Sequence, residues 1–307
     1  MTIQKKSYTS GHFELIIDGH KSTAYLKSVD GGHVVANTIS EPIGTHNQQI
    51  KSISTLDIEP FTLDFGISGA KDVLKWIRSS WKKNYSRRNG MITHANFDLQ
   101  RTYEHEFFEA MITETTFPAL DGAAKDTAYL KVKIQPERVL ERKMSPGEKI
   151  KPEGGAKQKL WTANSFRLTI DGFKGFEYTN KIEAFTIKQG IKKGMHGEHR
   201  FAQIEPTKLE FPHICGTLGL DYADDLLRWR DKYHRDGGQE PDNQRTGELE
   251  FLGPDKKTVI FSINLFEVGI HKVALQQSQA NQDSIKRVKY ELYVGYMEMD
   301  GPALGMD

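Results

Sequence analysis

The chain has 307 residues, 37% of them hydrophobic and 27% charged, which predicts a folded protein of about two domains of ~150 residues each. Its 42 basic and 41 acidic residues give a net charge of +1, which excludes the broad basic face of a nucleic-acid-binding module. The single cysteine, Cys215, excludes an intrachain disulfide, favours cytoplasmic synthesis and is expected to be a small buried hydrophobe.

The first part of the chain predicts strands around a polar insertion. Residues 13–18 read as a strand that ends in an Asp-Gly turn, and residues 24–29 and 33–35 as extended segments around a second turn. The polar segment 40–53 is expected to be a long loop or a hairpin arm, because it has little to bury. Residues 58–65 alternate in polarity and predict a half-buried strand.

An amphipathic helix is predicted next, over residues 68–85, with Trp76 in its core-facing stripe. The basic run at residues 82–88 is interpreted as the solvated end of this helix, where cations suit the helix dipole. Further strands are expected at 91–99, 104–113 and 128–135. Residues 141–159, rich in Lys, Glu, Pro and Gly, predict a linker.

The second half predicts the same order of elements. We expect a helix over residues 222–234, with Trp229 in its core and the acidic pair Asp224 and Asp225 at its start. A polar, glutamine-rich loop is expected at 276–283. Strands are expected at 247–252, 258–268 and 285–294.

Several short segments of the first half recur in the second half, in the same order. Residues 13–19 return 153 positions later as residues 166–172, and both copies read Phe-x-Leu-x-Ile-Asp-Gly. Three further matches pair 58–60 with 204–206, 74–76 with 227–229, and 119–120 with 274–275. A period this long indicates two copies of a domain rather than a solenoid of small units.

These observations predict an α+β, mainly β fold with two homologous antiparallel β-barrel or sandwich domains, each with one flanking helix. The expected boundaries are domain 1 at residues 1–140, a linker at 141–159 and domain 2 at 160–307. The sequence contains no signal-peptide pattern at its first residues and no apolar stretch long enough to span a membrane.

The order of landmarks resembles the tail tube protein family of contractile phages and contractile injection systems. The resemblance covers most of residues 10–140 and extends to the second half mainly through the duplication. It is carried by the opening strand at 13–19, the polar arm, the Trp76 helix, Arg88–Ile92 (Arg-Asn-Gly-Met-Ile), residues 117–122 (Phe-Pro-Ala-Leu-Asp-Gly) and the closing segments 125–128 and 131–137.

The resemblance implies a tail-tube-like fold, in which barrel-like domains pack six to a ring and rings stack into a tube. Neighbouring domains would join their sheets edge to edge, and the arm would reach into the adjoining ring. The implied partners are other copies of the chain, neighbouring tube, sheath or baseplate proteins, and DNA or effector cargo in the lumen. The particle would assemble in the cytoplasm and be released as a virion tail or injection device.

The chain departs from the family because it carries two tube-like domains instead of one. Either three chains supply six domains to one ring, or six chains form two layers. The second copy also lacks the Phe-Pro-x-Leu-Asp segment, which favours a specialised ring such as a tube initiator, hub adaptor or terminator over the repeating tube.

The candidate assembly residues lie in the two predicted arms, at residues 41–53 and 188–201. The second arm is basic and is expected to meet an acidic surface or to line the bore. The candidates are Glu41, Thr45, His46, Gln48, Ile50, Ile53, Lys188, Lys192, Lys193 and Arg200.

No catalytic, cofactor or metal site is predicted, and the chain is expected not to be an enzyme. His196 and His199 flank Glu198 but lie three residues apart, in a segment expected to be a solvated loop, whereas a zinc hydrolase needs a four-residue spacing on a helix. His105 alternates with Glu104 and Glu106 on a strand, so the three side chains cannot converge. Two other hypotheses stay open: a monomeric tandem β-sandwich binding module or cargo protein, and a hydrolase that uses the histidine loop.

Overall fold

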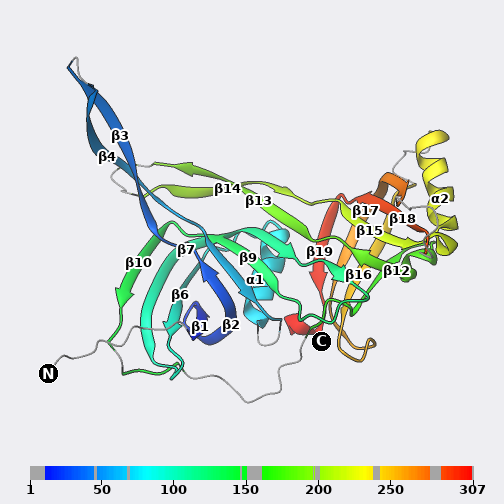
Figure 1. Ribbon diagram of the computed structural model, residues 1–307, viewed down its shortest axis with the longest axis horizontal. Coiled ribbons are helices and arrows are strands. Elements are labelled where there is room, and N and C mark those ends of the chain that lie inside the picture. The colour runs from blue at the N-terminus through cyan, green and yellow to red at the C-terminus, as the bar shows by residue number, and fades with distance from the viewer. Residues whose placement is uncertain are drawn as a thin grey trace.

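The computed structural model describes residues 11–44, 47–67, 70–145, 147–150, 161–195, 197, 201–237, 243–276 and 285–305. Two barrel-like β bodies lie side by side, and a long hairpin projects from the first of them (Figure 1). The predicted fold class, mainly β with few helices, is confirmed.

The first body is built from ten strands and one helix. Their bounds are β1 His12–Ile17, β2 His20–Asp30, β3 Val34–Ile43, β4 Gln48–Ile58, β5 Phe61–Phe65, α1 Lys71–Trp81, β6 Arg88–Ala95, β7 Arg101–Phe117, β8 Leu120–Asp121, β9 Leu130–Gln135 and β10 Arg138–Lys143. Antiparallel pairing runs from β7 through β6, β1, β2, β5 and β9 and back to β7, so six strands close a barrel. Closure removes the free sheet edges along this circuit.

The second body repeats this plan. Its elements are β11 Phe166–Ile170, η1 Gly175–Tyr178, β12 Thr179–Ile182, β13 Phe185–Gly194, β14 Gln203–Glu210, β15 Ile214–Gly219, η2 Leu220–Tyr222, α2 Asp224–Arg230, η3 Asp231–Arg235, β16 Arg245–Leu252, β17 Val259–Leu275, β18 Arg287–Tyr293, β19 Tyr296–Asp300 and η5 Pro302–Leu304. The strands of the second body follow the same order as those of the first barrel, namely β11-β16-β17-β18-β15-β12. In the first barrel a ladder joins β1 to β2, whereas in the second body a single bridge from Ile170 to Phe173 takes its place.

Strand registers show that the two bodies are copies. Phe13 faces His94 across β1 and β6, and Phe166 faces Phe251 across β11 and β16. Each long strand also contains a non-glycine residue with a positive φ at the same place, Glu109 with φ 51° in β7 and Glu267 with φ 54° in β17. A shared bulge of this kind is a property of the fold rather than of one local sequence.

Two of the four sequence matches are wrong in register. Phe61 pairs with Ile134 and Ile214 with Leu292 in the equivalent strands, so the structural counterpart of residues 58–60 is 211–213, not 204–206. In the same way, residues 274–275 correspond to 116–117 rather than to 119–120. Short apolar patterns recur in many β segments, whereas backbone pairing fixes one register.

Helix α1 is shorter than the predicted 68–85 and lies between the two bodies. Its apolar face is buried through Val73, Leu74, Trp76, Ile77 and Trp81. Its polar side faces β19 of the second body, where Arg78 lies 3.8 Å from Asp300 and Lys82 lies 3.2 Å from Glu298. The apolar face of the helix therefore packs into the core of the first barrel, and its polar face contacts the second barrel.

Each body carries one two-stranded arm. Strands β3 and β4 form the first arm, a hairpin that extends well beyond the barrel (Figure 1). All ten residues of β3 are exposed, and the arm carries large exposed apolar side chains such as Ile50 at 56% and Ile53 at 65%. Strands β13 and β14 form the second arm, which lies along the first body. The predicted hairpin arm is thus confirmed, and residues 192–194, expected in a loop, belong to β13.

The division at residues 140 and 160 stays a prediction. Strand β10 runs on to Lys143 and pairs with β7 as far as Tyr103, so the first sheet continues into the segment expected to be linker. The predicted polar loop at 276–283 lies outside the described residues except for Gln276.

Candidate functional site

The second arm extends the sheet of the first barrel. Residues 185–188 of β13 pair antiparallel with residues 117–114 of β7, from Phe185↔Phe117 to Lys188↔Glu114. Beside this ladder, Lys181 and Ile182 of β12 pair with β8. We call these two ladders, with the side chains packed between them, the domain junction. Strand addition of this kind supplies main-chain hydrogen bonds that are largely independent of sequence.

Aromatic rings fill the domain junction. The Phe117 side chain is 0% exposed, and its ring stacks on Phe185 at 4.9 Å and on Phe251 at 5.6 Å between centroids. Trp81 of α1 approaches the Phe117 ring at 6.1 Å, and Trp161 packs edge-on against Phe251 at 5.3 Å. Burial of several large rings makes this junction a continuous core rather than a loose contact between domains.

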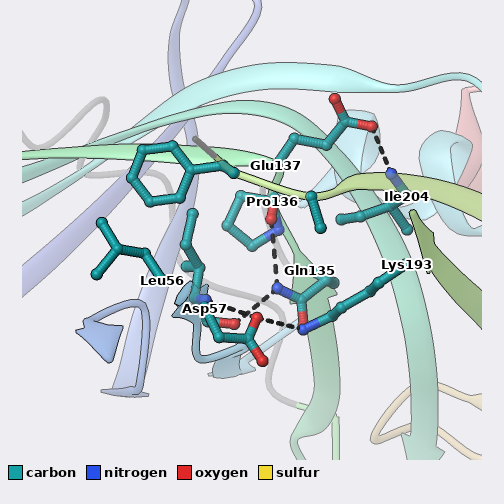
Figure 2. Close-up of a pocket in the computed structure, with 10 residues that line it drawn as sticks. Leu56, Asp57, Gln135, Pro136, Glu137, Lys193 and Ile204 are labelled. Carbon is teal, nitrogen blue, oxygen red and sulfur yellow. Dashed lines mark hydrogen bonds and ion pairs between the residues drawn. The ribbon is translucent and has the colours of Figure 1, made fainter. Parts of the chain in front are cut away.

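The end of the second arm docks beside the root of the first arm (Figure 2). The Lys193 ammonium donates a hydrogen bond of 2.6 Å to Oδ1 of Asp57. Oε1 of Glu137 accepts a 2.8 Å bond from the amide of Ile204 and pairs with Arg87. Arg87 also donates a 2.5 Å bond to the Ile204 carbonyl, so one arginine and one carboxylate hold both backbone groups of a residue in the second arm.

The charge of this contact is locally balanced. Partial burial alone would raise the pKa of Asp57, but hydrogen bonds from Lys193 and from the Ile58 amide, together with the Lys193 charge, outweigh it and lower that pKa. Gln135 donates a 2.9 Å bond to the Ile58 carbonyl and secures the strand that carries Asp57. The root of the first arm is therefore held by both barrels.

The predicted assembly residues fall into two separate groups. Glu41, Gln48, Ile50 and Ile53 lie on the exposed first arm, and Lys188, Lys192 and Lys193 lie on the second arm. Thr45, His46 and Arg200 lie outside the described residues. Lys193 contacts Asp57 within the same chain, and the role of all ten in assembly stays a prediction.

Sequence reasoning missed the residues that form the junction. The sequence predicts Arg87 at the solvated end of a helix, but its side chain reaches Glu137 and the second arm. Phe117 opens the Phe-Pro-Ala-Leu-Asp-Gly segment, but neither that segment nor the sequence around Phe185 indicates that the two rings meet. Their shared role depends on two strands 68 residues apart in sequence lying in one sheet.

The two strands of the β7–β13 ladder each have a counterpart elsewhere in the described residues, and these counterparts do not pair with each other. Residues 272–275 of β17 are equivalent to 114–117 of β7 and pair with β18 on one side. Among the described residues, no strand pairs with their other side. The equivalent of β13 is β3, whose root is exposed: Val34 is 41% exposed, whereas its counterpart Ile187 is 2% exposed. Likewise, Leu275 is 69% exposed and its counterpart Phe117 is 0% exposed.

A histidine cluster lies at the root of the first arm. It consists of His33, just before β3, His94 of β6, His105 of β7 and Glu141 of β10. The His105 ring lies 5.4 Å from His33, 5.2 Å from His94 and 5.0 Å from Tyr103 between centroids, and its side chain is 3% exposed. Burial, above all, and the neighbouring histidines lower the pKa of His105 from 6.5 to about 4, although Glu141 opposes the shift.

The buried His105 predicts a loss of stability at acid pH. Its folded pKa lies below its ordinary value, so the unfolded chain binds the proton first, and stability present above pH 6.5 is lost as the pH falls towards 4. At about 1.4 kcal/mol per pKa unit, we expect His105 to contribute up to about 3 kcal/mol to this loss. The free energy of unfolding is measured by urea denaturation of the wild type and of His105→Ile, at several pH values between 4 and 6.5. EDTA is added to both so that no metal ion binds the histidines. Parallel pH profiles would contradict the prediction.

The remaining chemical candidates have ordinary structural roles or lie beyond the description. His196, Glu198 and His199 lie outside the described residues. Cys215 is half-buried and unpaired, and burial followed by the charges of Glu291 and Glu183 raises its pKa, which disfavours the reactive thiolate. Trp76 and Trp229 are core residues, 2% and 3% exposed. No helix in the described part of the chain is long and apolar enough to cross a membrane.

Comparison with known proteins identifies the first body. Residues 9–140 match the family model of the T4-like virus tail tube protein gp19. None of the curated proteins compared is similar enough to match the chain. Among the solved structures that are similar to it, three are described next, and each matches less than half of its length.

One is the sheath-tube complex of an extracellular contractile injection system, PVC, in its extended state (18% identity, 46% of this chain and 95% of that chain, TM-score 0.39). The second is the tube-terminating cap of the anti-feeding prophage (17% identity, 47% and 100%, TM-score 0.37). The third is Hcp1 from Flavobacterium johnsoniae (12% identity, 44% and 94%, TM-score 0.27). The family match confirms the resemblance: residues 9–140 form a tail tube domain of the T4-like gp19 family, and the chain is a structural component of a tail.

Proposed function

We propose that the chain acts without catalysis, as a ring component of a contractile tail or injection device, and that three copies close one ring of six tube-like domains. The observation that supports this is the domain junction itself. It joins two copies of one fold inside the chain, and the counterparts of its β7 and β13 segments are present a second time, each with one side unpaired among the described residues.

The register of the domain junction defines the contact between chains. Residues 34 and 35 of β3 correspond to residues 187 and 188 of β13, because both arms share one bulge, at Ala36/Thr38 and at Gln189/Ile191. The root of β3 in one chain would therefore pair with residues 275–272 of β17 in the next. Val34 would face Val273 in this ladder. We call this contact the chain junction.

Charges at equivalent positions suit the same contact. In the domain junction, Arg78 of α1 faces Asp300 of β19. The equivalent residues at the chain junction are Asp231, after α2, and Arg142 on β10, so the pair recurs with its charges exchanged. An exchanged pair keeps the attraction between the two elements and discriminates against pairing of the wrong domains.

A head-to-tail contact of this kind closes into a ring when its rotation divides a full turn. The tail tube resemblance implies six domains per ring, and each chain supplies two that are already joined, so three chains complete it. The first arm would then project from the ring, and its exposed Ile39, Ile43, Ile50 and Ile53 suit an adjoining ring or another tail protein. The first arm is free and the second arm is docked, so the two domains differ. This difference favours a specialised ring, such as a tube initiator, adaptor or terminator, over the repeating tube.

The mass of the purified protein in solution tests this proposal. Light scattering at several concentrations is expected to show a species of three chains, and negative-stain images of that species should show rings with six lobes. Six chains in two layers would refute the stoichiometry while retaining ring assembly. A strict monomer at high concentration, without other tail proteins, would contradict self-assembly and support the monomeric binding module.

A further inference from the structure

We propose that His33, His105 and Glu141 form a binding site for one divalent transition metal ion, with Zn²⁺ as the best-suited ion. One possible ligand atom of each residue lies within 4.8 Å of the other two, and the residues come from three separate places in the first body. His33 precedes the first arm, His105 lies in the first third of β7, and Glu141 lies on β10. A metal ion at this point would tie the root of the arm to the barrel.

The spacing of the ligand atoms suits a small tetrahedral ion after minor movement. Ligands about 2.0–2.1 Å from zinc in a tetrahedral site are roughly 3.3 Å from one another. Nδ1 of His33 lies 3.3 Å from Oε1 of Glu141, and Nε2 of His105 lies 4.0 Å from the same oxygen. Two imidazoles and one carboxylate are a common zinc donor set, and one position would stay open for water or a fourth ligand.

The buried His105 ring supplies a second, independent observation. Among the described residues, neither Nδ1 nor Nε2 of His105 has a hydrogen-bond partner, although the side chain is 3% exposed. Nε2 of the adjacent His94 is also buried without a partner. Buried polar atoms are nearly always satisfied, so an unpaired ring aimed at a carboxylate and a second imidazole indicates a missing ligand.

The duplicated fold provides an internal control for the cluster. At the equivalent positions, the second body has Phe251 for His94, Phe261 for Tyr103, Ile263 for His105 and Met299 for Glu141. All four are 0% exposed, and Phe251 and Phe261 also contact Phe117 across the domain junction. The barrel therefore packs well with apolar side chains here, and the polar set of the first body is not a requirement of the fold.

The surroundings of Glu141 also suit metal binding. The Tyr103 hydroxyl donates a 2.7 Å hydrogen bond to Oε2 of Glu141, which leaves Oε1 facing the two histidines. Hydrogen bonds from His33 and Tyr103 oppose the effect of burial and lower the pKa of Glu141. The carboxylate is thus ionised and oriented near neutral pH, as a metal ligand must be.

A second group, His213, His271 and Glu291, meets the same distance criterion but lacks these features. Both histidines are exposed, and Lys272 lies 3.8 Å from Glu291, where it would compete with a cation. This group has no buried unpaired nitrogen. It serves as the matched control, because it would report adventitious binding by surface histidines.

Calorimetric titration of the EDTA-treated full chain with Zn²⁺ tests the site. The wild type and His271→Ala are expected to bind one equivalent with the same affinity. His105→Ile, which introduces the residue of the second body, should raise the dissociation constant at least about 100-fold. His33→Ala alters an exposed side chain and should weaken binding similarly, so it keeps the test valid if the core variant does not fold.

Co²⁺ gives a structural readout of the same site. Four-coordinate Co²⁺ with nitrogen and oxygen ligands absorbs visible light, and this absorption should appear in the wild type and be lost in His105→Ile and His33→Ala. Binding that is unchanged in both variants, or absent from the wild type, would refute the proposal. All three ligands belong to one chain, so the result does not depend on ring formation.

Discussion

Replacing Val34 by Asp is expected to leave the monomer folded and to prevent ring assembly. Val34 is 41% exposed in the isolated chain, so the change costs little there, but its counterpart Ile187 in the domain junction is 2% exposed. A carboxylate buried opposite Val273 would lack a partner, at a cost of several kcal/mol. We therefore expect each chain–chain contact to weaken by at least about 100-fold, measured as the concentration at which assembly appears in light scattering.

The opposite surface and a control sharpen this test. Leu275→Asp alters the β17 edge that would receive β3 and should have the same effect. Ile53→Asp alters a residue that is 65% exposed on the first arm, where we expect contact with an adjoining ring and not within one ring, so single rings should still form. If Val34→Asp and Leu275→Asp assemble as well as Ile53→Asp does, the ladder between β3 and β17 is not the contact.

Replacing Phe117 by Ala is expected to have the largest effect on stability. The ring is fully buried among Trp81, Phe185 and Phe251, and its loss leaves a cavity between two rigid sheets. Truncation of a buried phenylalanine costs about 3–5 kcal/mol. The free energy of unfolding, from urea denaturation followed by tryptophan fluorescence, should fall by this amount, because Trp81 and Trp161 report on the same junction.

The matched variant is Leu275→Ala, at the equivalent position of the second body. Leu275 is 69% exposed in the single chain, so its truncation should change the stability of the monomer by less than about 0.5 kcal/mol. It should nevertheless weaken assembly, because Leu275 would occupy the place of Phe117 in the chain junction. A large loss of monomer stability in Leu275→Ala, or none in Phe117→Ala, would contradict the equivalence of the two junctions.

Local sequence patterns predicted most of the fold because they report on faces of single elements. The helical spacing around Trp76 and Trp229 predicted both helices, and the alternation of polar and apolar residues at 58–65 predicted β5. The repeat of Phe-x-Leu-x-Ile-Asp-Gly gave the duplication, because β1 and β11 keep the same inward residues. Two of the short matches, 58–60 with 204–206 and 119–120 with 274–275, failed, because short apolar patterns recur in many β segments and only strand pairing fixes one register.

The functional surfaces were less accessible from the sequence. A polar insertion with no core to join predicts an arm, and strand β3 of the first arm is exposed along its whole length. The sequence excludes convergence of His105 with Glu104 and Glu106, because the three alternate on one strand, but it does not indicate the histidine cluster. The partners of His105 come instead from β6, from β10 and from the segment before β3, which no spacing along one strand reveals.

The sequence by itself determined the element types, the duplication and the family of the first domain, because each depends on residue order within about twenty positions or on a repeat of that order. The tertiary structure alone decided which arm is docked and which is free, and which strand edge remains open. Phe117, Arg87 and His105 acquire their roles from groups up to 134 residues away, through pairing of distant strands. Such contacts depend on the closure of the whole barrel, so no local pattern could encode them.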